Sequence, residues 1–226
     1  MKKILSILIS LTLALSLFSG CSNLNFGADD GKLNIVCTIF PEYDWVKQIL
    51  GDNTENAELT LLIDNGVDLH SFQPSAQDIA TISTCDLFVY VGGESDTWVD
   101  DALAQATNDD MVVIDLLEVL GDEVEEEEVV EGMQAEEEEE EEAEGEGEVE
   151  EIEYDEHVWL SLQNAIAICN HISSALQDLD ADNAEVYKAN TASYVEQLSA
   201  LDDEYRQVVS EASFDTVVFG DRFPFR

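Results

Sequence analysis

Hydrophobic and polar positions along the chain fall into blocks that predict strands and helices in alternation. Residues 33–40 (LNIVCTIF) are β-branched and apolar, which is typical of a strand buried on both faces. The next segment predicts a helix that begins at Pro41, where a missing N–H is tolerated, and ends at Gly51. Further along, the pattern predicts strands at 58–63, 86–91 and 111–117, and helices at 76–84 and 97–106.

This alternation indicates the fold class. Strands that follow one another through helices form a parallel sheet, so we expect an α/β lobe with helices on both faces of the sheet. Ser75, with Asp78 three residues later, is the predicted N-cap of the helix at 76–84. Ligands of such sheets bind beyond the carboxyl ends of the strands, in the loops that lead into the helices.

The last third of the chain predicts two helices and one strand. A helix is expected at 160–179, and residues 183–212 repeat apolar side chains every three or four positions. At 1.5 Å per residue the second helix is about 45 Å long, which suits a helix that joins two lobes. Residues 216–219 (TVVF) then predict the first strand of a second, similar lobe, which we expect to be incomplete in this sequence.

The first residues have the pattern of an export signal. Lys2 and Lys3 precede an apolar run at 4–18, and small residues at 19–20 lead directly to Cys21. Residues 17–21 (LFSGC) resemble the bacterial lipobox, in which the cysteine is lipidated and becomes the mature N-terminus. We therefore expect a signal peptide at 1–20, lipidation of Cys21 and a flexible tether at 21–32, with an ordinary secreted protein as the alternative.

The charge of the chain is extreme and unevenly distributed. The formal net charge is −44, and residues 122–153 hold 20 of the 52 acidic residues and no basic one. Like charges repel and this run has little apolar area to bury, so we expect a disordered loop. A chain this acidic repels nucleic acid and favours cations, which excludes nucleic-acid binding.

Three cysteines remain after Cys21, at positions 37, 85 and 169. Their wide spacing and the absence of any CxxC pair indicate small buried hydrophobic side chains. One disulfide with one free thiol is the alternative in an oxidising compartment.

Two of the three histidines lie in predicted loops. His70 lies between the second strand and its helix, and His157 directly precedes the helix at 160–179. Each has acidic neighbours that could accept a hydrogen bond from the imidazole ring. Neutral imidazole is a favoured ligand of zinc and other late first-row metals, although position alone leaves surface or capping roles open. His171 falls inside a helix and is expected to be structural or exposed.

Several segments resemble one protein family. Residues 66–75 (GVDLHSFQPS) and 156–161 (EHVWLS), together with 34–51 and 91–93 (VGG) followed by Trp98, are similar to the zinc- and manganese-type substrate-binding lipoproteins of metal ABC transporters. The resemblance implies that His70 and His157 bind a divalent metal, with zinc favoured over manganese, and that no organic cofactor is needed. It also implies two similar α/β lobes on either side of a long helix, with the metal between them.

The sequence departs from the family pattern at three places. The acidic insertion contains no histidine, so we expect a solvated spacer, with weak collection of hard cations by its carboxylates as the alternative. Gly220 stands where the family places a third histidine, and Asp221 is the candidate replacement unless it pairs with Arg222. The last carboxylate ligand of the family has no counterpart in these residues.

The resemblance implies an extracytoplasmic protein that captures a divalent transition metal and delivers it to an ABC permease. It would be a monomer, anchored by lipid to the outer face of the bacterial cytoplasmic membrane. The sequence contains neither an HExxH helix nor a Gly-rich phosphate loop, so no such motif indicates an enzyme. A metallohydrolase would also require a general base that the sequence does not identify. The alternative is an acidic surface lipoprotein that acts as an adhesin or a cation-buffering interaction protein.

The predicted organisation follows from these segments. We expect the product to continue beyond Arg226, so that the sequence is a gene fragment or a partial reading. Its predicted parts are a signal peptide at 1–20, a tether at 21–32, an N-terminal lobe at 33–121 and 154–181, a Glu-rich loop at 122–153, a long linking helix at 182–213, and the first strand of a second lobe within 214–226.

Overall fold

The structure is a computed structural model of the chain, and it describes residues 31–64, 66–125, 154–214 and 216. The chain divides into two units, 1–30 and 31–226, and every described residue belongs to the second unit. The predicted signal peptide, the lipidation site at Cys21, most of the Glu-rich loop and Asp221 lie outside the described residues.

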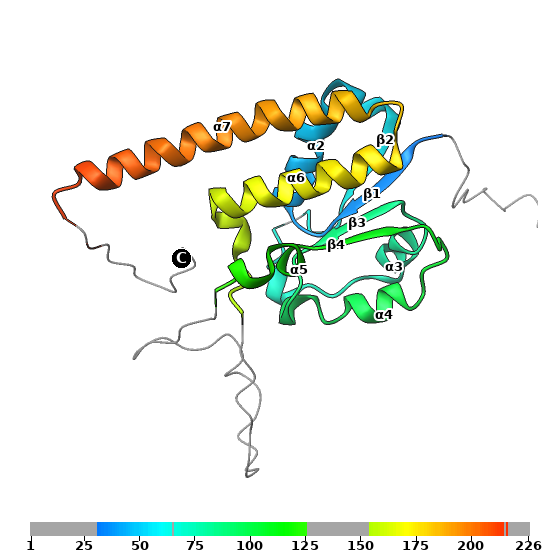
Figure 1. Cartoon of the computed structure of the whole chain (residues 1–226). Coiled ribbons are helices and arrows are strands. Elements are labelled where there is room, and N and C mark those ends of the chain that lie inside the picture. The colour runs from blue at the N-terminus through cyan, green and yellow to red at the C-terminus, as the bar shows by residue number, and fades with distance from the viewer. Residues whose placement is uncertain (1–30, 65, 126–153, 215, 217–226) are drawn as a thin grey trace, which may run out of the picture. The chain divides into compact units, whose positions relative to one another are not determined.

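Four parallel strands form one sheet in the order β2-β1-β3-β4 (Figure 1). The first strand of the chain therefore lies inside the sheet, paired with β2 on one side and β3 on the other. This arrangement confirms the predicted parallel α/β lobe. The strands are β1 (Leu33–Cys37), β2 (Ala57–Leu61), β3 (Leu87–Tyr90) and β4 (Val112–Asp115).

Helices cover both faces of the sheet (Figure 1). On one face lie α2 (Phe40–Leu50) and α6 (Leu162–Leu179), with α7 (Ala184–Glu211) packed against both. On the other face lie α3 (Ala76–Ile82) and α4 (Val99–Leu103), and α5 (Leu116–Leu120) follows β4 directly. The short 3-10 helices are η1 (Gly51–Asn56), η2 (Leu69–Ser71), η3 (Glu94–Asp96), η4 (Gly121–Glu123) and η5 (Val158–Leu160).

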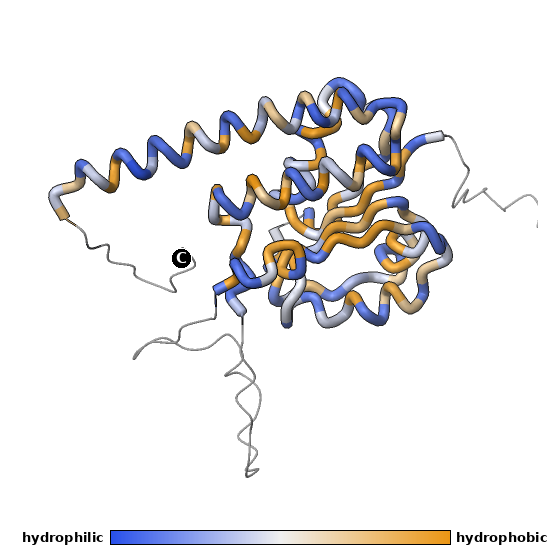
Figure 2. Tube along the Cα trace, viewed as in Figure 1, coloured by the Kyte–Doolittle hydropathy of each residue, from blue (hydrophilic) through white to orange (hydrophobic). Residues whose placement is uncertain are grey.

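Successive residues of the inner strands point into different layers of the core. Ile35 and Cys37 of β1 join the cluster under α2 and α6, whereas Val36 joins the cluster under α3 and α4. Because side chains alternate across a strand, an inner strand covered on both faces must be apolar throughout. The apolar strands stand out in the centre of Figure 2, and all three of these side chains are at most 1% exposed.

Side-chain caps fix the starts of several helices. Ser75 accepts a hydrogen bond from the backbone N–H of Asp78 at 3.3 Å, and the Asp78 carboxylate accepts one from the N–H of Ser75 at 2.7 Å. This reciprocal pair confirms the capping box predicted for α3. Ser161 caps α6 in the same way, accepting from the N–H of Asn164 at 3.3 Å.

All four predicted strands are longer than the observed ones, and at two of them a carboxylate explains the difference. The prediction carried the first strand to residue 40, but the buried Glu42 carboxylate accepts the N–H groups of Thr38 and Ile39, and the chain turns there into α2. The strand predicted at 111–117 ends at Asp115, whose side chain accepts the N–H of Glu118 and starts α5. The prediction of a strand therefore missed α5 altogether.

The first residues of the predicted Glu-rich loop at 122–153 are described by the structure. Gly121–Glu123 forms η4, and Val124 is packed against the core. The chain therefore remains part of the folded lobe up to residue 125, the last described position before the acidic run continues.

The two C-terminal helices pack along each other. The hydroxyls of Thr191 of α7 and Ser173 of α6 share a hydrogen bond of 2.8 Å, and the Tyr187 hydroxyl donates to Asp180 at 2.6 Å. With 28 residues, α7 is about 42 Å long, and it extends past the end of α6 (Figure 1). Its second half exposes large apolar side chains, with 41–72% of their surface accessible at Leu201, Tyr205, Val208 and Val209.

Three cysteine thiols are buried in the described structure. Cys37, Cys85 and Cys169 form no disulfide and are completely buried, as the sequence predicted for small hydrophobic side chains. Burial raises the pKa of the Cys85 and Cys169 thiols to about 12, so both stay protonated. Among the described residues, no helix has the length and apolar character required to cross a membrane.

Candidate metal centre

His70 lies beyond the carboxyl end of β2, in the 3-10 turn η2. Asp68 caps this turn by accepting the backbone N–H of His70 at 3.0 Å, and the buried Leu69 anchors it to the core. The ring nitrogen Nδ1 lies 2.7 Å from the Ser95 hydroxyl and 3.9 Å from Oε2 of Glu156. Asp68, two positions before His70, therefore shapes the backbone, while Ser95 and Glu156, distant in sequence, lie close to the ring.

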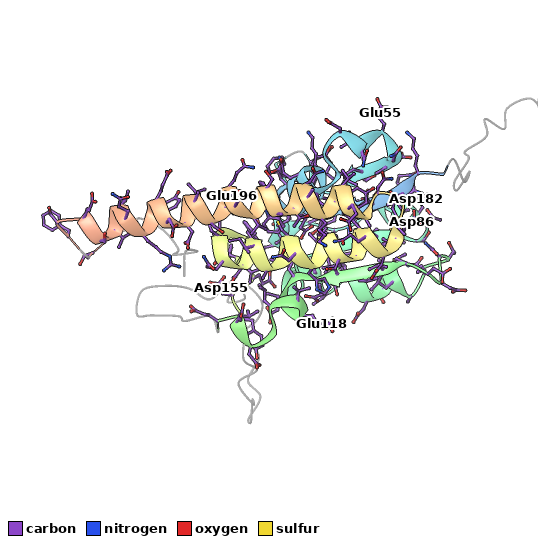
Figure 3. The ribbon with its side chains drawn as sticks, turned by 45° about the horizontal axis from the view of Figure 1, so that its top comes forward. Glu55, Asp86, Glu118, Asp155, Asp182 and Glu196 are labelled. Atoms are coloured by element: carbon purple, nitrogen blue, oxygen red, sulfur yellow. The ribbon has the colours of Figure 1, made fainter. Side chains whose placement is uncertain are left out.

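His157 lies directly before η5, at the start of the segment that leads into α6. Asp155 accepts two hydrogen bonds from this residue, one from the backbone N–H at 3.0 Å and one from ring Nδ1 at 2.9 Å. The next side chain, Val158, is buried and fixes the turn, while the Trp159 ring lies 5.3 Å from the imidazole. Figure 3 labels Asp155 near the start of α6. The prediction that an acidic neighbour would accept from the ring is therefore confirmed at His157.

The two imidazole rings meet although they are 87 positions apart in the sequence. Their centroids are 5.5 Å apart and their planes are inclined at 54°. A zinc–nitrogen bond of about 2.0–2.1 Å places an imidazole centroid about 3.2 Å from the metal, so two rings on a tetrahedral ion are separated by about 5 Å. The observed spacing is compatible with two ligands of one ion.

The fold explains why these loops meet. All four strands are parallel, so the segments that follow β2, β3 and β4 emerge at the same edge of the sheet. The described residues contain no group of three or more His, Cys, Asp or Glu side chains arranged to hold a metal. Of the predicted ligands, the structure therefore brings His70 and His157 together, and Asp221 lies outside the described residues.

Acidic side chains surround the histidine pair. A cavity of ≈ 110 Å³ beside His157 is lined by Glu123, Glu125 and Asp155 among others. Glu156 is 7% exposed, and its Oε2 has no hydrogen-bond partner in the described structure. These carboxylates give the approach to His157 a negative potential, which favours a divalent cation.

One further carboxyl group lies deeper, in the turn after β3. Asp96 is 3% exposed and accepts the N–H groups of Val91 and Gly92, each at 3.0 Å. Burial raises its pKa to about 6; the hydrogen bond from Gly92 opposes this rise, and the nearby charge of Glu156 adds to it. The carboxyl group of Asp96 thus holds the η3 loop, which carries Ser95, against the end of β3.

Sequence reasoning missed Ser95 and the burial of Glu156. Ser95 lies 25 positions from the ring it contacts, and no local pattern indicates that contact. The Gly92–Gly93 pair after the third strand is the available signal, since both residues have a positive φ and allow the loop to turn back to the site. His171 is exposed on α6, as predicted.

Comparison with known proteins identifies a family for this arrangement. The sequence model described as ZnuA, zinc-uptake complex component A, periplasmic, matches residues 35–224. The zinc-binding lipoprotein AdcA of Streptococcus pneumoniae is 39% identical over 216 residues, which is 94% of this chain and 39% of that protein. The high-affinity zinc uptake system protein ZnuA of Bacillus subtilis is 34% identical over 200 residues, or 87% of this chain and 59% of that protein.

Solved structures show the same similarity. The crystal structure of Zn(II)-bound AdcA from Streptococcus pneumoniae matches with a TM-score of 0.61 and 32% identity, covering 80% of this chain and 34% of that one. The structure of its Zn(II)-bound ZnuA-like domain matches with a TM-score of 0.59 and 33% identity, covering 81% of this chain and 58% of that chain. The chain thus spans about two fifths of the full-length AdcA proteins that it matches.

Proposed function

The chain belongs to the family of periplasmic zinc-uptake components, and on this premise we propose that it captures a divalent transition metal, zinc in preference to manganese, through His70 and His157. The observation that carries the proposal is the meeting of the two rings, at 5.5 Å between centroids, on loops at the carboxyl edge of the sheet. Neutral imidazole is a strong ligand for zinc, whereas manganese prefers oxygen ligands.

The relatives support zinc as the cargo. AdcA and ZnuA are named for zinc binding and zinc uptake, and two of the similar structures contain Zn(II). Asp155 supports the ligand role of His157, because a carboxylate that accepts from Nδ1 fixes the ring and raises the basicity of the other nitrogen. A third ligand is needed for tight binding, and we propose Asp221 for that place.

The biological role follows from the family. We propose that the protein is an extracytoplasmic receptor, held by lipid at Cys21 to the outer face of the cytoplasmic membrane, which delivers its ion to an ABC permease. It would act as a monomer without an organic cofactor and without catalysing a reaction. The AdcA and ZnuA relatives are named for binding and uptake of a metal, which supports this role over an enzymatic one.

The test is zinc titration by calorimetry on the purified chain and three histidine variants. His70→Ala and His157→Ala each remove one proposed ligand and should abolish the single zinc site or weaken it at least about a hundredfold, since each metal–imidazole bond is lost outright. His171→Ala is the matched control, because His171 is exposed on α6, away from the pair. It should bind zinc as the unaltered chain does.

The outcomes separate the candidate roles. Zinc binding that is insensitive to both His70→Ala and His157→Ala would contradict the proposal and would assign the ion to carboxylates. A site with equal affinity for manganese and zinc would contradict the preference for zinc. Loss in all three variants, His171→Ala included, would point to a general effect on folding, which circular dichroism of the variants would reveal.

A further inference from the structure

Ser95 contacts His70 and the residue that precedes His157 through different atoms. Its hydroxyl lies 2.7 Å from Nδ1 of His70, and its backbone N–H donates to Oε1 of Glu156 at 3.0 Å. Glu156 immediately precedes His157 in the chain. One residue of η3, after β3, therefore connects the loop that follows β2 with the segment that leads into α6.

The chemistry of the contacts fixes how the His70 ring carries its hydrogen. A neutral imidazole has one N–H and one lone pair, and a hydroxyl can serve either as donor or as acceptor. The Glu156 carboxylate lies 3.9 Å from Nδ1, and its Oε2 has no hydrogen-bond partner in the described structure. A negative charge there repels a lone pair on Nδ1 and favours an N–H, so the Ser95 hydroxyl accepts and the lone pair of the ring is on Nε2.

Gly93 makes the close approach of Glu156 possible. It has a φ of 76°, which favours glycine, and a Cβ at this position would collide with the Oε1 atom that Ser95 binds. Glu156 is 7% exposed, so its carboxylate is held between the η3 loop and the core. Glycine at position 93 therefore lets the η3 loop lie directly against the Glu156 side chain.

We propose that Ser95 is a positioning residue that couples the two histidine segments, since its hydroxyl accepts the Nδ1–H of His70 that the Glu156 charge favours, and its amide holds that carboxylate in place. This inference rests on the proposed function insofar as it concerns zinc. The tautomer of His70 is a property of the metal-free chain and does not depend on that function. The His157 ring is held separately, because Asp155 accepts from its Nδ1, while the Ser95 amide holds the residue that precedes it.

The first experiment measures the tautomer of His70 in the metal-free chain by two-bond ¹H–¹⁵N correlation at about pH 8.5. We expect the Nδ1–H form in the unaltered chain and in Ser95→Thr, which keeps the hydroxyl. Ser95→Ala should give a mixture of both tautomers. Ser71→Ala, an exposed serine in the same turn as His70, is the matched control and should leave the tautomer unchanged. An unchanged tautomer in Ser95→Ala would overturn the assignment.

The second experiment measures the coupling through zinc affinity in a double-mutant cycle. Ser95→Ala should weaken zinc binding about ten- to hundredfold, the usual effect of losing a partner of a ligating histidine, and Ser95→Thr should restore it. Glu156→Ala removes the charge that favours the Nδ1–H bonded to the Ser95 hydroxyl, so the double variant should lose about as much as the weaker-binding single variant. Independent, additive losses would overturn the coupling.

Failure of this inference can be told apart from failure of the proposed function. If Ser95→Ala shifts the tautomer of His70 but zinc binding ignores His70→Ala, the assignment of Ser95 stands and the proposed function is wrong. If His70→Ala abolishes zinc binding while the tautomer and affinity ignore Ser95→Ala, the proposed function stands and the inference is wrong.

Discussion

Asp96 illustrates how one buried side chain in the turn after β3 makes stability depend on pH. Its pKa rises from an ordinary value of 3.8 to about 6, first because burial penalises the charged form. Between these values the unfolded chain is ionised and the folded chain holds the proton, so folding becomes less favourable as pH increases. The contribution of Asp96 to stability is complete below about pH 4 and is lost by about pH 6.

We predict that Asp96→Asn reduces this pH dependence. Asparagine keeps a carbonyl oxygen that can accept from the N–H groups of Val91 and Gly92, but it does not titrate. The difference in unfolding free energy between the two chains should change by about 1.4 kcal/mol per pH unit between about pH 4 and 6. Urea unfolding at a series of pH values measures this difference. Parallel stability curves would contradict the assigned pKa.

At the same scale, the sequence indicates some site residues and hides others. His70, His157 and the acceptor Asp155 could be predicted, because each stands in a loop next to a recognisable motif or beside its own partner. Ser95 could not, since its contact with His70 depends on how two loops meet after folding. Asp68 accepts the backbone N–H of His70 and thereby fixes the turn that carries the ring.

At the scale of the element, the N-cap of α3 is a simple test of local sequence. Replacing Ser75 with Ala removes the acceptor of the Asp78 N–H and should lower the free energy of unfolding by about 1 kcal/mol. Ser75→Thr keeps a capping hydroxyl and should lose much less. Chemical unfolding of the three chains measures both effects. Equal losses in Ala and Thr would show that the cap contributes little.

The two C-terminal helices allow a matched comparison of buried and exposed leucines. Leu176 of α6 is completely buried, whereas Leu201 of α7 is 41% exposed. Leu176→Ala should reduce the free energy of unfolding by about 2–5 kcal/mol, because it leaves a cavity in the core. Leu201→Ala should change it by less than about 0.5 kcal/mol, as at other surface positions. Similar losses at both positions would indicate that the second half of α7 is buried in solution.

The elements themselves were predicted better than their boundaries. Strong apolar blocks located β1 to β4, and the capping box located α3, because these signals are local. Two carboxylates end strands that the apolar pattern alone would continue. Glu42 accepts backbone N–H groups where α2 starts, and Asp115 does so where α5 starts. A strand in a buried sheet and a short helix after it have the same composition, so hydrophobicity alone does not separate them.

At the scale of the whole molecule, the net charge of −44 should strengthen the capture of cations. We predict that zinc affinity falls about three- to tenfold as ionic strength rises from about 20 to 300 mM, because salt screens the field of the chain. Titrations in sodium perchlorate avoid complexes of zinc with chloride. An affinity that is independent of salt would contradict a role for the overall charge.

A control variant measures how much the acidic run contributes to zinc affinity and to its salt dependence. Replacing the glutamates at 126–153 with glutamine should leave most of the zinc affinity intact if the run is a spacer, since the carboxylates at the cavity beside His157 remain. If the run collects cations, the variant should lose weak calcium binding as well as much of the salt dependence of zinc binding.

The strand order has a consequence for how the chain is made. β1 emerges first, yet the face that carries Ile35 and Cys37 is covered by Ile168 and Cys169 of α6, which follows the acidic run. As the chain appears from its N-terminus, α2 can cover part of this face early, but the part that packs on α6 remains uncovered until the residues after the acidic run have been synthesised. We expect mutual repulsion among the acidic side chains to keep neighbouring half-made chains apart during this interval. The acidic run would thus reduce association of nascent chains before the metal centre has formed.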